Sequence, residues 1–141
     1  MVSKAFEYER KVYYYETDKM GVMHHSNYIR LFEEARVAFL ENAGLPYSSL
    51  EACGLMSPVI SVQCRYMSPL SFDEKFVVET QIDSFNGFRF EITYKIKSRN
   101  SGKLCAEGNS QHCFTNKAMK PIRIKNNYRE IYDLFESCCN D

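Results

Sequence analysis

The residues best suited to chemistry lie in one short stretch, between Thr17 and Arg30. The carboxylate of Asp18 stands just before a predicted turn at Gly21, and a helix is expected to begin a few residues later. The first N–H groups of a helix have no partners within it and carry the positive end of the helix dipole. An acid beside such a helix start suits acyl transfer, because the carboxylate can attack a carbonyl carbon or activate water while the N–H groups stabilise the oxyanion.

Other interpretations of this stretch stay open. On its spacing alone, Asp18 could be only a turn or capping residue. His24 and His25 invite a metal-binding interpretation, but adjacent side chains at a helix start point in different directions, and with Asp18 they give at most three ligands. We therefore predict no metal site. We expect His25 to position the loop or line a pocket, and His112, on the inner face of the last predicted strand, to be a core residue.

A long helix must carry the second half of the stretch. Apolar residues recur at helical spacing over residues 26–43, with Ser26 or Asn27 as candidate caps and Gly44 as the end signal. Glu33 and Glu34 lie past its first turn, where a solvated position or an ion pair with Arg30 or Arg36 is expected. Two shorter helices are predicted, over residues 47–53 and 126–138.

Alternation of apolar and polar residues predicts the strands. Arg10 interrupts the apolar face of the first one, and Asn86-Gly87 is a strong hairpin signal between the third and the fourth. The predicted strands cover residues 6–14, 58–66, 75–83, 88–97 and 103–115. The order of one strand, one helix and four strands predicts an α+β fold in which a five-stranded antiparallel sheet wraps around the long helix. Because such a sheet has open edges, pairing between subunits and hence a homo-oligomer are expected.

The composition excludes several classes of function. The chain has 141 residues, enough for one domain over residues 1–141, and its 18 basic residues balance 18 acidic ones. Neither nucleic acid nor an anionic membrane surface is therefore expected as a main partner. No segment reaches the roughly 20 apolar residues of a membrane span, and residues 1–20 do not resemble a secretory leader. The six cysteines form no disulfide framework, so we expect a cytoplasmic protein with free thiols and with Cys138 and Cys139 exposed.

One sequence motif, taken together with the order of the predicted elements, points to a known family. It runs Tyr14-Tyr15-Glu16-Thr17-Asp18, then Gly21-Val22, His25-Ser26-Asn27-Tyr28 and Phe32-Glu33-Glu34-Ala35-Arg36. Over roughly residues 5–130 the chain resembles the hotdog-fold acyl-CoA thioesterases. The similar subgroup is that of 4-hydroxybenzoyl-CoA thioesterase and the bacterial Tol-Pal-associated acyl-CoA thioesterases. The segment Pro58–Tyr66, followed by Pro69 and Asp73-Glu74, also resembles the family's second strand and turn.

The resemblance implies roles for individual positions. Asp18 matches the catalytic aspartate, and the backbone N–H near His25 matches the group that polarises the thioester carbonyl. The substrate-binding positions that we assign are Gly21, Val22, Tyr28, Ser61 and Gln63. The family's active site lies at a dimer interface, so Ser61 and Gln63 are expected to come from the neighbouring subunit of a homodimer or homotetramer. Tol-Pal-associated members often carry Val-Tyr-His where this chain has Met23-His24-His25, so we expect a different pocket shape there.

The expected activity is hydrolysis of acyl-CoA to free acid and CoA, without a cofactor beyond the CoA of the substrate. Two alternatives are hydrolysis of acyl-carrier-protein thioesters and a non-catalytic acyl-CoA-binding protein of the same fold. Apolar residues expected to line the acyl pocket would accept an aliphatic chain or a ring; they are Met20, Met23, Phe32, Phe39, Met56 and Met67.

Overall fold

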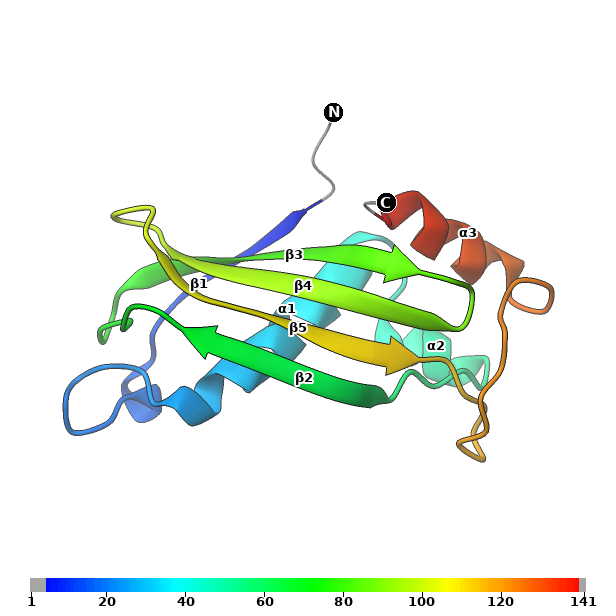
Figure 1. Ribbon diagram of the computed structural model, residues 1–141, viewed down its shortest axis with the longest axis horizontal. Coiled ribbons are helices and arrows are strands. Elements are labelled where there is room, and N and C mark those ends of the chain that lie inside the picture. The colour runs from blue at the N-terminus through cyan, green and yellow to red at the C-terminus, as the bar shows by residue number, and fades with distance from the viewer. Residues whose placement is uncertain (1–4, 140–141) are drawn as a thin grey trace.

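The computed structural model describes residues 5–139, which form an antiparallel sheet and three α-helices (Figure 1). The strands lie in the order β1-β3-β4-β5-β2, and each is antiparallel to its neighbours. The elements in chain order are β1 (Phe6–Lys11), the 3₁₀ turns η1 (Tyr14–Glu16) and η2 (His25–Asn27), α1 (Tyr28–Asn42), α2 (Tyr47–Ala52), β2 (Val59–Tyr66), β3 (Lys75–Phe85), β4 (Arg89–Ser98), β5 (Leu104–Cys113) and α3 (Arg129–Cys138).

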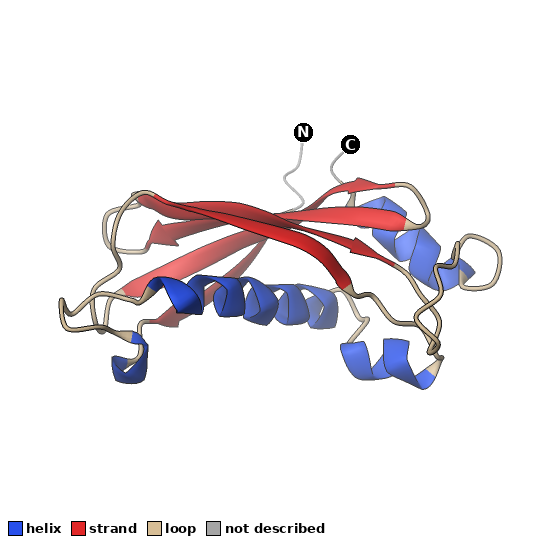
Figure 2. Ribbon diagram, turned by 60° about the horizontal axis from the view of Figure 1, so that its bottom comes forward, coloured by secondary structure: helices blue, strands red, loops and turns tan. Residues whose placement is uncertain are grey.

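The sheet arches over α1 (Figure 2). The buried face of α1 includes Leu31, Phe32 and Phe39. The Phe32 ring stacks on that of Tyr94 in β4, with 4.3 Å between the ring centroids. Each large apolar side chain buried in this way contributes about 1.5–3 kcal/mol to folding. The structure confirms the predicted α+β fold, a five-stranded antiparallel sheet around one long helix.

The first strand is shorter than predicted. We expected a strand over residues 6–14, but β1 ends at Lys11 and η1 follows. Tyr14, which lies within the predicted strand, is 78% exposed. The cause is Glu16, whose buried carboxylate accepts a hydrogen bond from the Tyr13 N–H (2.9 Å) and so holds the chain in a turn.

The start of the long helix also differs from the prediction. Neither Ser26 nor Asn27 caps α1 through its side chain. Instead the Nδ1 atom of His24 accepts a hydrogen bond from the Ser26 N–H (3.2 Å) and caps η2. Gly44, with a φ of +88°, ends the helix as predicted, because a positive φ is unfavourable for residues with a Cβ.

The C-terminal segment packs against the sheet. The Phe135 side chain of α3 is buried, and Cys139 forms a β-bridge with Ile82 of β3. The expectation that Cys138 and Cys139 are exposed is therefore wrong: Cys139 is buried and Cys138 is half-buried. The apolar face of α3 is buried against the sheet, and the docking of this helix places Cys139, which follows it, beside β3. Cys53, Cys64, Cys105, Cys113 and Cys138 are free thiols.

Candidate active site

The residues from Thr17 to Met23, which we call the Asp18 loop, form a closed turn. Thr17 and Met23 pair as an antiparallel bridge, and the Asp18 N–H donates to the Val22 carbonyl (2.9 Å). The Gly21 N–H donates to the Asp18 carbonyl (3.0 Å), and the φ of Gly21 is +76°, which confirms the positive φ expected there. The loop is thus a tight hairpin with Asp18 at its base.

The Asp18 carboxylate is only partly engaged. The residue is half-buried, and its Oδ1 atom accepts a hydrogen bond from the Met20 N–H (2.8 Å). Its other oxygen has no hydrogen-bond partner among residues 5–139. Asp18 borders a surface hollow together with Tyr14, Tyr15 and Phe72. The free oxygen is therefore available to a ligand or a water molecule.

Contacts to the segment before β3 fix the loop from the other side. The Met23 N–H donates to the Leu70 carbonyl (2.8 Å), and the Phe72 N–H donates to the Gly21 carbonyl (3.0 Å). Val22 pairs with Ser71 between these two bonds. Gly21 and Val22 therefore present backbone with a defined position, which suits the substrate-binding role predicted for them.

The start of the helix leaves one backbone donor free. The Ser26 N–H donates to the His24 ring, the Asn27 N–H to the His24 carbonyl and the Tyr28 N–H to the His25 carbonyl. The His25 N–H has no acceptor among the described residues. This is the N–H group that the family resemblance predicts to polarise the thioester carbonyl.

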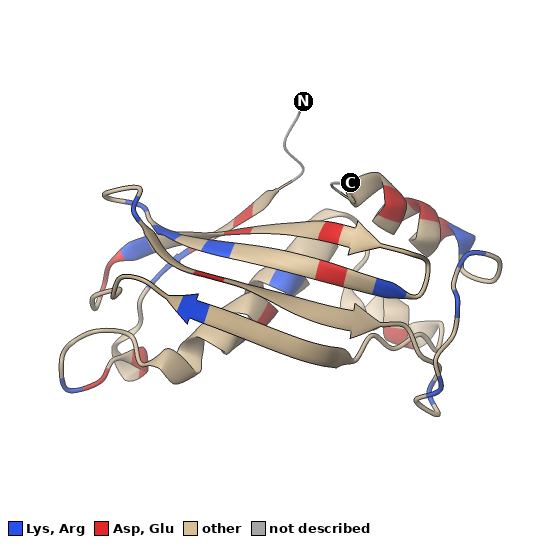
Figure 3. Ribbon diagram, viewed as in Figure 1, with Lys and Arg blue, Asp and Glu red and all other residues tan. Residues whose placement is uncertain are grey.

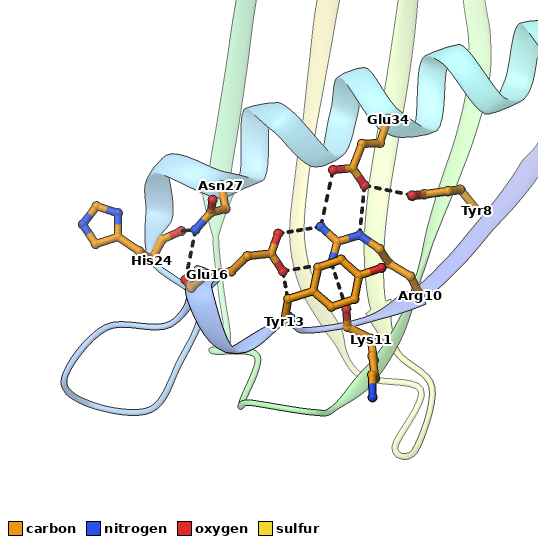
Figure 4. A network of polar contacts seen from close by, with 8 residues as sticks. All are labelled: Tyr8, Arg10, Lys11, Tyr13, Glu16, His24, Asn27 and Glu34. Carbon is orange, nitrogen blue, oxygen red and sulfur yellow. Dashed lines mark hydrogen bonds and ion pairs between the residues drawn. The ribbon is translucent and has the colours of Figure 1, made fainter.

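A partly buried polar network holds the Asp18 loop against α1 (Figure 4). Arg10 forms an ion pair with Glu16 (Nη2 to Oε2, 2.6 Å) and a second one with Glu34 of α1 (Nε to Oε1, 2.9 Å). The Tyr8 hydroxyl also donates to Glu34 (2.8 Å). We predicted that Glu34 is solvated or paired with Arg30 or Arg36, but its ion-pair partner is Arg10. Arg10 turns inward because two carboxylates face it, which is the physical reason for its place on an apolar strand face.

The side chain of Asn27 joins the two ends of the loop. Its Nδ2 atom donates to the carbonyls of Glu16 (3.0 Å) and His24 (3.3 Å), and the His24 N–H donates to the same Glu16 carbonyl (2.8 Å). Burial would raise the pKa of the Glu16 carboxyl, but hydrogen bonds from Arg10 and the Tyr13 N–H lower it below its usual value. Glu16 is thus held as a carboxylate, which keeps the network charged and closed.

Two tyrosine rings lie near the start of the helix. Tyr28 is buried and meets Tyr66 of β2 edge to face, with 5.0 Å between the centroids. The Tyr66 hydroxyl donates to the His25 carbonyl (3.4 Å). Burial raises the pKa of Tyr28 to about 12, so its phenol is neutral near pH 7 and can act as a hydrogen-bond donor. Tyr28 is therefore a buried, neutral ring at the start of α1, and its substrate-binding role stays a prediction.

Ser61 and Gln63 lie elsewhere. In β2 the side chains of Val62 and Cys64 pack against the core, so Ser61 and Gln63 point to the opposite, exposed face of the sheet. On that face Arg65 of β2 forms an ion pair with Glu107 of β5 (3.9 Å), and Figure 3 marks positions of both charges along the strands. One chain thus brings together Asp18, Gly21, Val22, His25 and Tyr28 at one end of the molecule and leaves Ser61 and Gln63 apart from them.

The residues expected to line a single acyl pocket are also dispersed. Met23, Phe32 and Phe39 are buried in the core, Met56 is half-buried after α2, and Met20 and Met67 are exposed. Hydrophobicity alone does not separate core from pocket, because both use the same side chains.

Across residues 5–139 no helix is long and apolar enough to span a membrane.

The chain is similar in sequence to known proteins of one family. The sequence matches the family model of the thioesterase-like superfamily over residues 12–129. YneP of Bacillus subtilis, named as a candidate acyl-CoA thioesterase, is 34% identical over 91% of this chain and 93% of its own length. A candidate esterase of Aquifex aeolicus is 39% identical over 77% of this chain and 83% of its own.

Solved structures share the fold. A DHNA-CoA thioesterase from Staphylococcus aureus superposes with a TM-score of 0.88 at 28% identity, covering 94% of this chain and 89% of the other. A hypothetical protein of Aquifex aeolicus gives a TM-score of 0.84 at 35% identity, covering 92% and 98%. The helix wrapped by a five-stranded sheet is therefore the hotdog fold of thioesterases. By the extent of the family match, the chain belongs to the thioesterase-like superfamily.

Proposed function

We propose that this protein hydrolyses acyl-CoA thioesters, with Asp18 as nucleophile or general base and the His25 N–H as oxyanion donor. Two groups without partners among the described residues carry the proposal: one carboxylate oxygen of Asp18, and the backbone N–H of His25, which follows the Asp18 loop. Membership of the thioesterase-like superfamily supports it, as do the names of the Bacillus subtilis and Staphylococcus aureus relatives.

The chemistry needs few groups. Asp18 either attacks the thioester carbon, forming an anhydride that water then hydrolyses, or removes a proton from a water molecule that attacks this carbon. In both cases the carbon–sulfur bond breaks. CoA leaves as a thiolate, and water supplies the second oxygen of the acid. An N–H donor placed at the oxyanion contributes on the order of 3 kcal/mol of transition-state stabilisation. No step requires a metal or a cofactor beyond the CoA of the substrate.

We further propose a homodimer or homotetramer with shared active sites, located in the cytoplasm. β2 is an edge strand, and its exposed Val59 and Ile60 offer a second copy an apolar border. Pairing there would let Ser61 and Gln63 serve the site of the other subunit. The free thiols of Cys53, Cys64, Cys105, Cys113 and Cys138 favour a reducing compartment. Sedimentation measures the mass of the assembly.

The test compares wild type with Asp18→Asn on a panel of aromatic and aliphatic acyl-CoAs, followed by thioester absorbance or mass spectrometry. We expect Asp18→Asn to lower kcat by at least 10²-fold, because the amide is neither a base nor a nucleophile. Asp83→Asn, the same change at an exposed position in β3, is the control. Equal activity of Asp18→Asn and Asp83→Asn would exclude Asp18 from the chemistry, and no turnover of any CoA ester would favour carrier-protein substrates.

A further inference from the structure

Arg36 of α1 is a buried cation without a close carboxylate. Only 8% of the residue is exposed. Its Nε donates to the Tyr47 hydroxyl (3.0 Å) and its Nη1 to the Tyr94 hydroxyl (3.1 Å), and both of these partners are neutral. Among the described residues the one carboxylate near it is Glu33, 4.0 Å from Nη2 and with a side chain 70% exposed. The charge of Arg36 is therefore poorly compensated.

This leaves donors to spare. A guanidinium carries five N–H donors, and these hydrogen bonds use two of them. Buried charges are normally paired, because an unpaired one forfeits its hydration without a replacement. A fork of spare N–H groups binds a carboxylate with two parallel charge-assisted hydrogen bonds better than any neutral group.

Arg36 also lines a cavity. A cavity of about 140 Å³ lies between α1 and the edge strand β2. Its apolar walls are Ile29, Phe32, Val59 and Val62, and its polar walls are Arg30, Glu33, Arg36 and Ser110. Cavities of about 150 Å³ hold a molecule the size of benzene, or a comparable length of alkyl chain. The cavity thus offers an apolar passage with a cation in its wall.

Hydrogen bonds behind the cavity fix this cation. The Tyr94 hydroxyl bonds Ser110 Oγ (2.6 Å), and Ser110 Oγ bonds His112 Nε2 (2.7 Å). Tyr94, Ser110 and His112 are all at most 1% exposed. A donor held on such a rigid support is preorganised for one ligand position.

We infer that Arg36 binds a carboxylate at the far end of the acyl group, so that the preferred substrate is a CoA monothioester of a dicarboxylic acid. This inference rests on the proposed function. His25 and Arg36 are eleven residues apart, about 16 Å along a helix axis. Helical side chains lean toward the N-terminus, which shortens the gap to roughly 10 Å and suits an acyl chain of about six to eight carbons. Because both groups belong to one chain, this span does not depend on the subunit arrangement.

The first experiment measures kcat/KM for adipoyl-CoA and suberoyl-CoA against hexanoyl-CoA and octanoyl-CoA, which match them in length. We expect wild type to prefer the diacid esters by tenfold or more. Arg36→Met should abolish this preference and leave the neutral esters no worse than the diacid ones. Arg30→Met, which removes an exposed cation bordering the same cavity, should keep the preference, whatever it does to the rate. A wild type without the preference, or an Arg36→Met that slows both classes equally, overturns the inference while the hydrolase stands.

A second measurement separates binding from catalysis and from folding. Equilibrium binding of adipoyl-CoA and hexanoyl-CoA to Asp18→Asn, by calorimetry, should show at least tenfold tighter binding of the diacid ester. Ile29→Trp, at the 48% exposed mouth of the cavity, should weaken both esters without disturbing Arg36. If wild type turns over no ester, the proposed function fails, and the calorimetric ratio still decides whether Arg36 recognises the carboxylate. Equal affinities overturn the inference.

Discussion

The side chain of Asn27 shows how one buried amide can govern a loop that it does not belong to. It bonds the carbonyls of Glu16 and His24, the residues that flank the Asp18 loop. The neighbouring N–H of His25 is the proposed oxyanion donor, and Asp18 lies at the base of the same loop. Asn27 is therefore a positioning residue: it acts through the spacing of two groups that meet the substrate.

Asn27→Asp tests this role. The carboxylate keeps the size of the amide but cannot donate, so two carbonyls lose a buried partner, which costs about 1–3 kcal/mol of folding free energy. We expect kcat to fall by tenfold or more with a smaller change in KM, because ground-state binding survives while the oxyanion geometry does not. Urea unfolding and steady-state kinetics measure both effects. Asn42→Asp, at the exposed end of α1, is the matched control. Unchanged kcat in a folded Asn27→Asp would show that the amide is only structural.

At the scale of the elements, the seating of α1 on the sheet depends on one glycine. Gly108 lies on the inner face of β5, opposite Cys64 of β2. A Cβ at this position would come within 2.6 Å of the Phe32 ring and closer still to the Gln63 carbonyl oxygen. Only hydrogen leaves room there, so the helix and the edge strand approach β5 as closely as they do. The close approach of Phe32 to Gly108 also fixes the position of Phe32 as a wall of the cavity beside Arg36.

We predict that Gly108→Ala lowers the free energy of unfolding by about 3 kcal/mol or more, because either Phe32 or the β2 backbone must move. Gly44→Ala is the comparison. Its φ is also unfavourable for alanine, at +88°, but nothing lies within 4 Å of the added methyl group, so a loss of about 1 kcal/mol is expected. Urea denaturation with a constant m-value gives the difference. A Gly108→Ala that loses no more than Gly44→Ala would mean that α1 does not sit so close.

At the scale of the whole molecule, His112 links stability to pH. Its ring is fully buried and stacks on Phe90 with 4.8 Å between centroids, and its Nδ1 has no hydrogen-bond partner among the described residues. Burial first, and then the charge of Arg36, lower the pKa of His112 to about 4; the Ser57 backbone, close by without good hydrogen-bond geometry, opposes the shift. The predicted core position is thus confirmed, although only one ring nitrogen is bonded.

The sign of the pH effect follows from this pKa. In the unfolded chain His112 becomes protonated below about pH 6.5, whereas in the native protein it stays neutral down to about pH 4. Stability is therefore fully present above pH 6.5 and falls between pH 6.5 and 4, by a total on the order of 3 kcal/mol. Urea unfolding at a series of pH values measures it. His112→Gln, which does not titrate, should flatten the dependence above pH 4.5. An equal slope in the variant would assign the effect to other groups.

The sequence by itself determined what depends on neighbouring residues. The apolar period of residues 26–43, the alternation of β4, the hairpin at Asn86-Gly87 and the positive φ of Gly21 are local, because backbone sterics and one buried face decide them. The tertiary structure decided every long-range partner. In the sequence Arg10 only interrupts an apolar strand face, and its ion pair with Glu34 of α1 is visible only in the fold. Cys139 likewise has the sequence context of an exposed tail, but it forms a bridge with Ile82. Bulges in β2 and β3 shift the strand register without a sequence signal. Arg36 is one of several helical cations in the sequence. Its burial without a close carboxylate is what distinguishes it, and this is the basis for the inferred binding of a substrate carboxylate. Charge compensation of this kind depends on which groups packing brings together.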